Sequence, residues 1–215
     1  MRERERRSVR EKLRLAVKLL AITAVFGAVV AANAQEPKRE AGTTVAPEPP
    51  ASQKHFTDVV LVNQNGERMR FYNDLLRDKV VIINSFFATC TGSCLPLNRN
   101  LEKIQTALGE RLGKDVHIIS ISVDPTVDTP TSLKEYAKKL NARPGWFFLT
   151  GRKQDVEFAL KKIGHFVDQK ESHLNIFIIG NERTGLWKKA FGLAPSDELV
   201  KIVESVINDQ PNRVE

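Results

Sequence analysis

The sequence lacks the features that nucleic-acid binding requires. Its 215 residues carry a formal net charge of +7. Residues 1–34 contain eight Lys or Arg against three Glu, a net +5, which leaves only +2 for the rest of the chain. A domain with so little excess charge attracts phosphates weakly, and no basic stripe interleaved with aromatics runs along it. The composition therefore argues against a nucleic-acid partner.

Long apolar runs are absent as well. The run at 19–32 is short for a membrane span of about 20 residues. It follows a basic segment and precedes Ala32-Asn33-Ala34, the small-x-small pattern of a signal cleavage site. Residues 1–34 are therefore predicted to be a cleaved signal peptide or, if the apolar run extends back to Leu13, an uncleaved membrane anchor. Either form places the rest of the chain in the periplasm or at the extracytoplasmic face of the membrane, where disulfides are permitted.

Residues 35–54 lack apolar periodicity and are rich in Pro, Ala and Glu. Such a composition cannot bury a core, which predicts a flexible linker. The chain has no internal repeat, and its length suits one folded domain plus appendages. We expect that domain at residues 55–215.

Strand and helix patterns alternate from residue 55 onward. Apolar residues alternate around an Asn65-Gly66 turn, which predicts a β-hairpin. An apolar, β-branched run at 79–87 predicts a central strand buried on both faces. Further strands are expected at 116–123, 146–149, 174–179 and 186–191, and helices after Cys94, at 130–140, at 153–163 and at 195–207, the last capped by Ser196. This order predicts an α/β sandwich of the thioredoxin type, with a mixed central sheet, an N-terminal β-hairpin and flanking helices.

The chain has only two cysteines, Cys90 and Cys94, which lie between a predicted strand and a predicted helix. The free N–H groups and the dipole at a helix start lower a thiol pKa, which favours thiolate chemistry here. A disulfide closing so short a loop stabilises by only about 2 kcal/mol, which a domain of this size hardly needs. Three residues intervene, one more than in the C-x-x-C motif of thioredoxin-type oxidoreductases. A redox pair and part of a metal site both remain open.

A metal site would need at least one further ligand, and imidazole suits copper and zinc alike. Of the four histidines, His55 is expected to be solvated at the end of the linker. His117, within a strand, and His165, near a helix end, are expected to have solvated or structural roles. His173 directly precedes the predicted strand at 174–179 and remains the candidate ligand. Spacing alone leaves its role open.

Three segments, FFATCTGSC, ISVDPTVDTP and SHLNIFIIG, occur in this order and resemble the Sco/SenC family. Its members are copper-binding, thioredoxin-like assembly factors for cytochrome c oxidase. The resemblance covers about residues 56–208. It implies that Cys90, Cys94 and His173 bind one copper ion, as Cu(I) or Cu(II). It also implies an anchored or exported protein that serves the dinuclear copper A centre of the oxidase.

Individual positions both support and depart from that pattern. Ser172-His173 stand where ordinary thioredoxin-like reductases have a cis-Pro, so a coordinating group replaces a substrate-docking bend. The family usually has Pro directly after each cysteine, whereas this chain has Thr91 and Leu95, which predicts a less rigid loop. The motif at 124–130 is expected to form a turn and a helix cap, with a lesser role in orienting the metal loop through hydrogen bonds.

Two functions from different classes follow. The first is a copper-binding chaperone, without turnover, for the oxidase subunit that carries the copper A centre. The second is a thiol–disulfide oxidoreductase in which Cys90 and Cys94 form the redox pair. It would keep cysteines reduced in the oxidase or in another exported copper or thiol protein. A structural zinc site would need a fourth protein ligand, and none is obvious.

Export is the first testable prediction. Because a basic segment, an apolar run and Ala32-Asn33-Ala34 follow one another, the domain should be found outside the cytoplasm, free from Gln35 or anchored. Cell fractionation with protease protection measures this, and a variant without residues 1–34 is the control that should stay inside. A full-length protein held in the cytosol would contradict both the location and the redox setting inferred from it.

Overall fold

A computed structural model of the protein describes residues 55–56 and 58–210. The predicted signal or anchor at 1–34 and the linker at 35–54 lie outside this range, so the division of the chain into these segments stays a prediction. Within the described residues, no helix combines the length and the apolar character needed to cross a bilayer.

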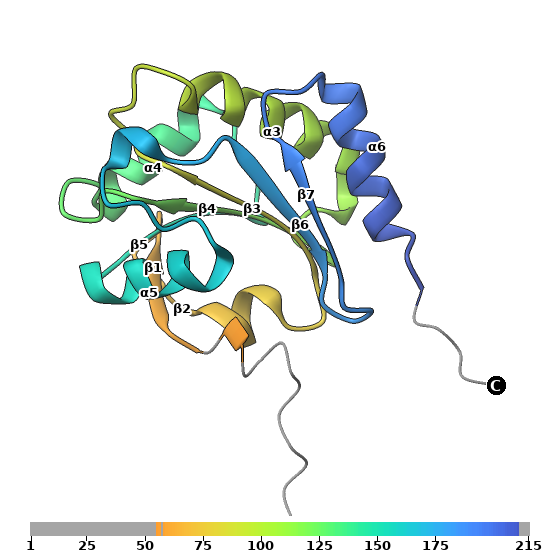
Figure 1. Ribbon diagram of the computed structural model, residues 1–215, viewed down its shortest axis with the longest axis horizontal. Coiled ribbons are helices and arrows are strands. Elements are labelled where there is room, and N and C mark those ends of the chain that lie inside the picture. Colours follow the sequence, from red (N-terminus) through yellow and green to blue (C-terminus); the bar gives the residue numbers. More distant parts are fainter. Residues whose placement is uncertain (1–54, 57, 211–215) are drawn as a thin grey trace, which may run out of the picture. The chain divides into compact units, whose positions relative to one another are not determined.

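Seven strands form one mixed sheet in the order β2-β1-β5-β4-β3-β6-β7 (Figure 1). The central strands β3, β4 and β5 run parallel, whereas β6, β7, β1 and β2 are antiparallel to their neighbours. The bounds are β1 Val60–Asn63, β2 Arg68–Arg70, β3 Val80–Phe86, β4 Val116–Ser122, β5 Trp146–Thr150, β6 Ile176–Asn181 and β7 Leu186–Phe191. The mixed sheet and the N-terminal β1–β2 hairpin match the sequence prediction.

Burial on both faces explains the composition of the central strands. All seven residues of β3 and all seven of β4 are buried. A parallel strand covered on both faces needs apolar side chains at successive positions rather than at alternate ones. The run VVIINSF of β3 has this character, apart from Asn84 and Ser85 near its end.

Helices cover both faces of the sheet. Figure 1 shows α3 (Cys94–Leu108), α4 (Pro130–Lys139) and α6 (Ser196–Ile207) on one side, and α5 (Lys153–Ile163) on the other. The two layers enclose two separate clusters of buried apolar side chains, one on each face. Side chains at helical spacing, such as Leu97, Leu101 and Ile104 of α3, point into the first cluster. The predicted α/β sandwich is confirmed.

Two helix starts test the predicted caps. Thr129 caps α4, because its Oγ1 accepts from the backbone N–H of Ser132 in a capping box. The cap predicted for α6 is wrong. Ser196 is already helical, and Pro195 is the cap residue because its carbonyl accepts the first helical bond, from the backbone N–H of Leu199.

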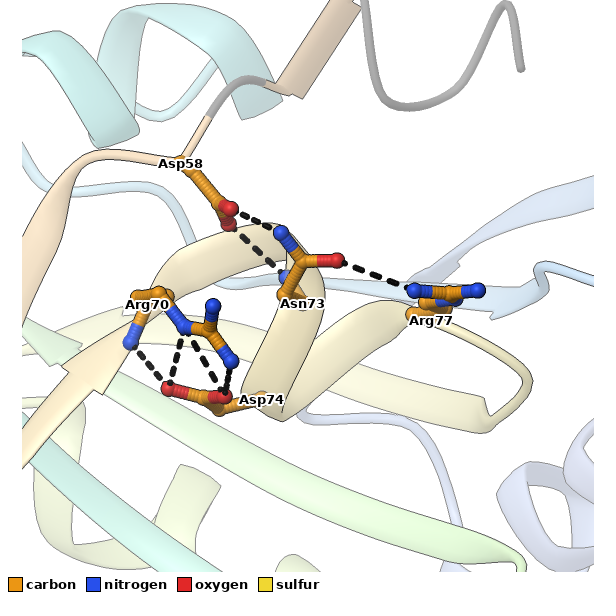
Figure 2. Close-up of polar contacts among 5 residues, drawn as sticks. All are labelled: Asp58, Arg70, Asn73, Asp74 and Arg77. Atoms are coloured by element: carbon orange, nitrogen blue, oxygen red, sulfur yellow. Dashed lines mark hydrogen bonds and ion pairs between the residues drawn. The ribbon is translucent and has the colours of Figure 1, made fainter. Parts of the chain in front are cut away.

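The segment Phe71–Leu76, labelled η1, is a single helical turn of the π type where the sequence indicated the end of a hairpin strand. Its apolar residues explain the difference, since positions 71, 72, 75 and 76 recur with a helical rather than a two-residue period. Figure 2 shows how its polar side chains are fixed. Arg70 forms an ion pair with Asp74 at 2.8 Å, and Asp58 accepts hydrogen bonds from Asn73.

Strand β6 begins at Ile176, two residues later than predicted, and extends to Asn181. Leu174 and Asn175 therefore lie in the connection that follows His173. The bounds of α5 and β7 agree with the prediction.

Two histidines occupy structural positions in the described domain, as expected. His117 donates from Nδ1 to the carbonyl of Leu75 at 3.0 Å. His165 is 1% exposed, and its Nδ1 lies 3.1 Å from Ser85 Oγ. Burial lowers the pKa of His165 to about 4, and the positive charges of Lys189 and His173 act in the same direction.

Acidification should therefore destabilise the fold. In the unfolded chain His165 has an ordinary pKa of 6.5, so between this value and about 4 the unfolded state binds a proton that the folded state does not. The free energy of unfolding should fall by about 3 kcal/mol across that window. Denaturant titrations at several pH values measure the slope, and His165→Gln should flatten it. An equal slope in both proteins would show that His165 does not contribute.

Candidate metal centre

The two cysteines follow the central strand β3. The loop at 87–93 leads from its end to α3, and Cys94 is the first residue of that helix. Cys90 is half-buried and the Cys94 side chain is fully buried. Both thiols are free, so the domain is described in its reduced form. The sequence correctly placed both residues between a buried strand and a helix start.

His173 reaches the same place from the far end of the chain. A short 3-10 turn, Lys170–Ser172, precedes it, and its backbone N–H bonds to the carbonyl of Lys170 at 3.1 Å. The ring nitrogen Nε2 lies 3.0 Å from Cys94 Sγ and 3.9 Å from Cys90 Sγ. The three ligand atoms lie within 4.8 Å of one another. The structure therefore brings together all three of the residues singled out in the sequence.

The donor set fits a soft transition-metal ion. Two sulfurs and one imidazole nitrogen suit copper, and three ligands of this kind leave a coordination position open. Burial lowers the pKa of His173, with the backbone of Leu174 opposing, so the ring favours its neutral, ligating form. Metal binding through Nε2 requires the tautomer with its proton on Nδ1. No other group of three His, Cys, Asp or Glu side chains in the described residues has this arrangement.

The expected lowering of the Cys94 pKa at the helix start is wrong. Burial raises the pKa of this thiol, and the neighbouring Cys90 and the Asp128 carboxylate raise it further. The sequence indicated the helix start but not the depth of burial, and desolvation of a thiolate outweighs the helix dipole. Cys94 is therefore protonated at neutral pH in the metal-free protein, and a metal must displace that proton to bind.

Asp128 connects the cysteine loop to the next strand. Its Oδ2 accepts from the backbone N–H of Ala88 at 3.0 Å and from the hydroxyl of Ser122 at 2.6 Å. Its own carbonyl accepts from Thr150 at 2.7 Å. The side chain is 2% exposed. The lesser role assigned to this motif in the sequence is thus supported by direct contacts with the loop.

Phe87 and Lys170 are two neighbours of the site that the sequence did not indicate. The ring of Phe87 meets the ring of His173 edge-on, at 5.7 Å between centroids. Lys170 contacts Asp124 at 2.6 Å. Nothing in the local sequence signals either contact, because each joins segments far apart in the chain.

Comparison with known proteins identifies the same family that the sequence motifs resemble. The family model for SCO1/SenC matches residues 46–206. The SCO1 protein homolog of Bacillus subtilis is 30% identical over 154 residues, which cover 66% of this chain and 78% of that protein.

Solved structures share the fold. Yeast Sco1 with copper bound has a TM-score of 0.59 at 25% identity, covering 73% of this chain and 95% of its own. A SCO1/SenC family lipoprotein from Bacillus anthracis gives 0.59 at 26%, covering 69% and 92%. BsSco, described as having a disulfide switch and as a member of the Sco family of cytochrome c oxidase assembly proteins, gives 0.58 at 28%, covering 70% and 92%. These likenesses confirm the fold class and the resemblance found in the sequence.

The difference in burial predicts which thiol reacts first. In the metal-free, reduced domain, iodoacetamide should modify the half-exposed Cys90 faster than the buried Cys94, by about tenfold or more. Mass spectrometry of digested samples taken over time measures both rates. In denaturant the two rates should converge, which serves as the control. Equal rates in the folded protein would contradict the protonated, inaccessible state inferred for Cys94.

Proposed function

The chain belongs to the SCO1/SenC family, and on this basis we propose that it binds one copper ion through Cys90, Cys94 and His173 for assembly of the copper A centre of cytochrome c oxidase. The observation that carries the proposal is the meeting of two thiols and one imidazole within 4.8 Å. Yeast Sco1, a structural relative, was crystallised with copper, and BsSco belongs to a family of oxidase assembly proteins.

The donor set favours copper over other metals. Two thiolates and one imidazole satisfy the three-coordinate preference of Cu(I), and a water or other oxygen completes the coordination of Cu(II). A structural zinc site takes four protein ligands. The described residues place no fourth Cys, His, Asp or Glu in this group.

The exposure of the site suits delivery rather than storage. Cys90 is half-exposed, and Leu95, one residue after Cys94, is 45% exposed. A partner's ligand can approach the ion over this side of the loop. We propose the copper A-bearing subunit of the oxidase as that partner.

The alternative function is thiol–disulfide exchange, favoured by the two free, adjacent thiols and by the disulfide switch named for BsSco. The half-exposed Cys90 would attack a partner disulfide as the thiolate and form a mixed disulfide. Cys94, after losing its proton, would then displace the partner's second thiolate. The partner gains two electrons and two thiols, and this chain ends with a Cys90–Cys94 disulfide.

The location proposed for either activity is outside the cytoplasm. The predicted signal or anchor at 1–34 supports it, and a structural relative is described as a lipoprotein, which suggests an extracytoplasmic position for that protein. An uncleaved segment would add membrane association.

His173 separates the two functions. His173→Ala removes the nitrogen donor of this group and should weaken copper binding by on the order of 100-fold, while Cys90→Ser or Cys94→Ser should abolish it. Disulfide formation should survive in His173→Ala, because the two sulfurs need only each other. Copper affinity is measured by competition with a chelator, and the dithiol potential by equilibration in glutathione buffers.

His55→Ala is the matched control, because its imidazole is exposed and hydrogen-bonds to the carbonyl of Lys162, away from the three candidate ligands. It should leave both quantities unchanged. If His173→Ala keeps its copper affinity while the dithiol potential moves, the exchange function is the correct one. Unchanged copper stoichiometry in either serine variant would remove the cysteines from the site.

A further inference from the structure

Lys170 joins the segment that carries His173 to the loop that follows β4. Its Nζ lies 2.6 Å from Asp124 Oδ2, and the Asp124 side chain is only 10% exposed. The same residue opens the 3-10 turn, and its carbonyl accepts from the backbone N–H of His173 at 3.1 Å. Lys170 thus bonds to His173 through its backbone and to the loop after β4 through its side chain.

The side chain of Lys170 also contacts the first residue of the cysteine loop, Phe87. Its ammonium lies 5.2 Å from the centroid of the Phe87 ring, and this ring meets His173 edge-on. Phe87 is 7% exposed and directly follows β3, so it is fixed by the core. The Lys170 ammonium and the His173 imidazole therefore both contact the ring of Phe87, whose position is fixed. This shared contact limits how far either group can move relative to the other.

The Lys170–Asp124 contact differs from the exposed ion pairs elsewhere in the described domain. Most of the exposed ion pairs join two well-exposed side chains, or two side chains three or four residues apart on one helix. Such ion pairs contribute little to the stability of the fold. Here one partner is nearly buried, and the partners are 46 residues apart. The Lys170–Asp124 ion pair therefore links two loops that strand pairing does not join.

We propose that Lys170 is a positioning residue of the metal centre, holding His173 at ligating distance from the two sulfurs by anchoring its segment to Asp124 across Phe87. The inference rests on the proposed metal function of Cys90, Cys94 and His173. Nε2 lies 3.0 Å from one sulfur and 3.9 Å from the other, so a small shift of the segment takes the imidazole away from Cys90. Strand pairing does not restrain His173 itself, since β6 begins only at Ile176.

The test uses two substitutions and a matched control in the full chain. Lys170→Met keeps the length of the side chain and removes its charge, whereas Lys170→Arg keeps the charge. Lys161→Met is the control, because Lys161 lies over the ring of Phe166 at 4.4 Å and its loss changes the net charge equally. Cu(I) affinity is measured by chelator competition at low and high salt. Backbone hydrogen exchange of the peptide covering 166–174 is measured without metal.

Lys170→Met should weaken copper binding about tenfold, the size expected for loss of a residue that orients a ligand. It should also speed exchange of the Ser172 and His173 amides, which bond to the carbonyls of Gln169 and Lys170. Lys170→Arg should restore both values, and Lys161→Met should alter neither. High salt should weaken binding more in the unmodified protein than in Lys170→Met, because the Lys170 side chain is 35% exposed and its ion pair is partly screened.

Unchanged exchange and affinity in Lys170→Met, or failure of Lys170→Arg to restore them, would overturn the proposal. The proposed function fails by a different result, namely copper binding that survives Cys94→Ser. The exchange measurement needs no metal and therefore decides the role of Lys170 in either case.

Discussion

The antiparallel pairing of β3 with β6 determines where the three candidate metal ligands meet. Ile83 of β3 lies opposite Ile178 of β6, so the end of one strand adjoins the beginning of the other. The cysteine loop leaves β3 at this point, and the His173 segment enters β6 there. Residues 79 positions apart are thereby brought to 3.0 Å. A shift of this register by one residue would turn every side chain of β6 to the opposite face, so core packing and site geometry are specified together.

A buried chain of hydrogen bonds connects α3, the helix that begins at Cys94, to the central sheet. Trp146 Nε1 donates to Ser120 Oγ, and this hydroxyl donates to Asn84 Oδ1. Asn84 in turn donates to Asn98, which donates to the hydroxyl of Tyr136. Asn98 lies one helical turn after Cys94 and on the same face of α3. Since every member has a partner, the chain specifies one seating of the helix on the sheet, where an apolar contact would allow several.

The sequence predicted those parts of the structure that depend on local patterns. Continuous apolar runs located β3 and β4, helical periodicity bounded α5, and the cap motif at 124–130 located the start of α4. The η1 turn was missed because Phe71 still continues the alternation of the hairpin, and the helical spacing appears only when Leu75 and Leu76 are included.

The properties that depend on contacts distant in sequence could not be predicted in this way. The direction of the Cys94 pKa shift follows from burial beneath other elements, and the sequence alone gave the opposite sign. The Lys170–Asp124 contact joins two loops, and neither residue carries a local signal. For the candidate ligands, local spacing left His173 undecided. Family resemblance selected it, and the fold brought it to the cysteines.

The unequal burial of the three candidate ligands has a kinetic consequence. Cys94 and His173 are buried and Cys90 is partly exposed, so an incoming ligand would approach a bound ion from the side of Cys90. For a bound ion, exchange would then follow a fixed order, with the Cys90 bond breaking first. The equilibrium constant for copper would depend on all three bonds, whereas the rate at which the ion leaves would depend chiefly on the bond to Cys90. Residence time and affinity can thus be altered separately, by substitutions on different sides of the same site.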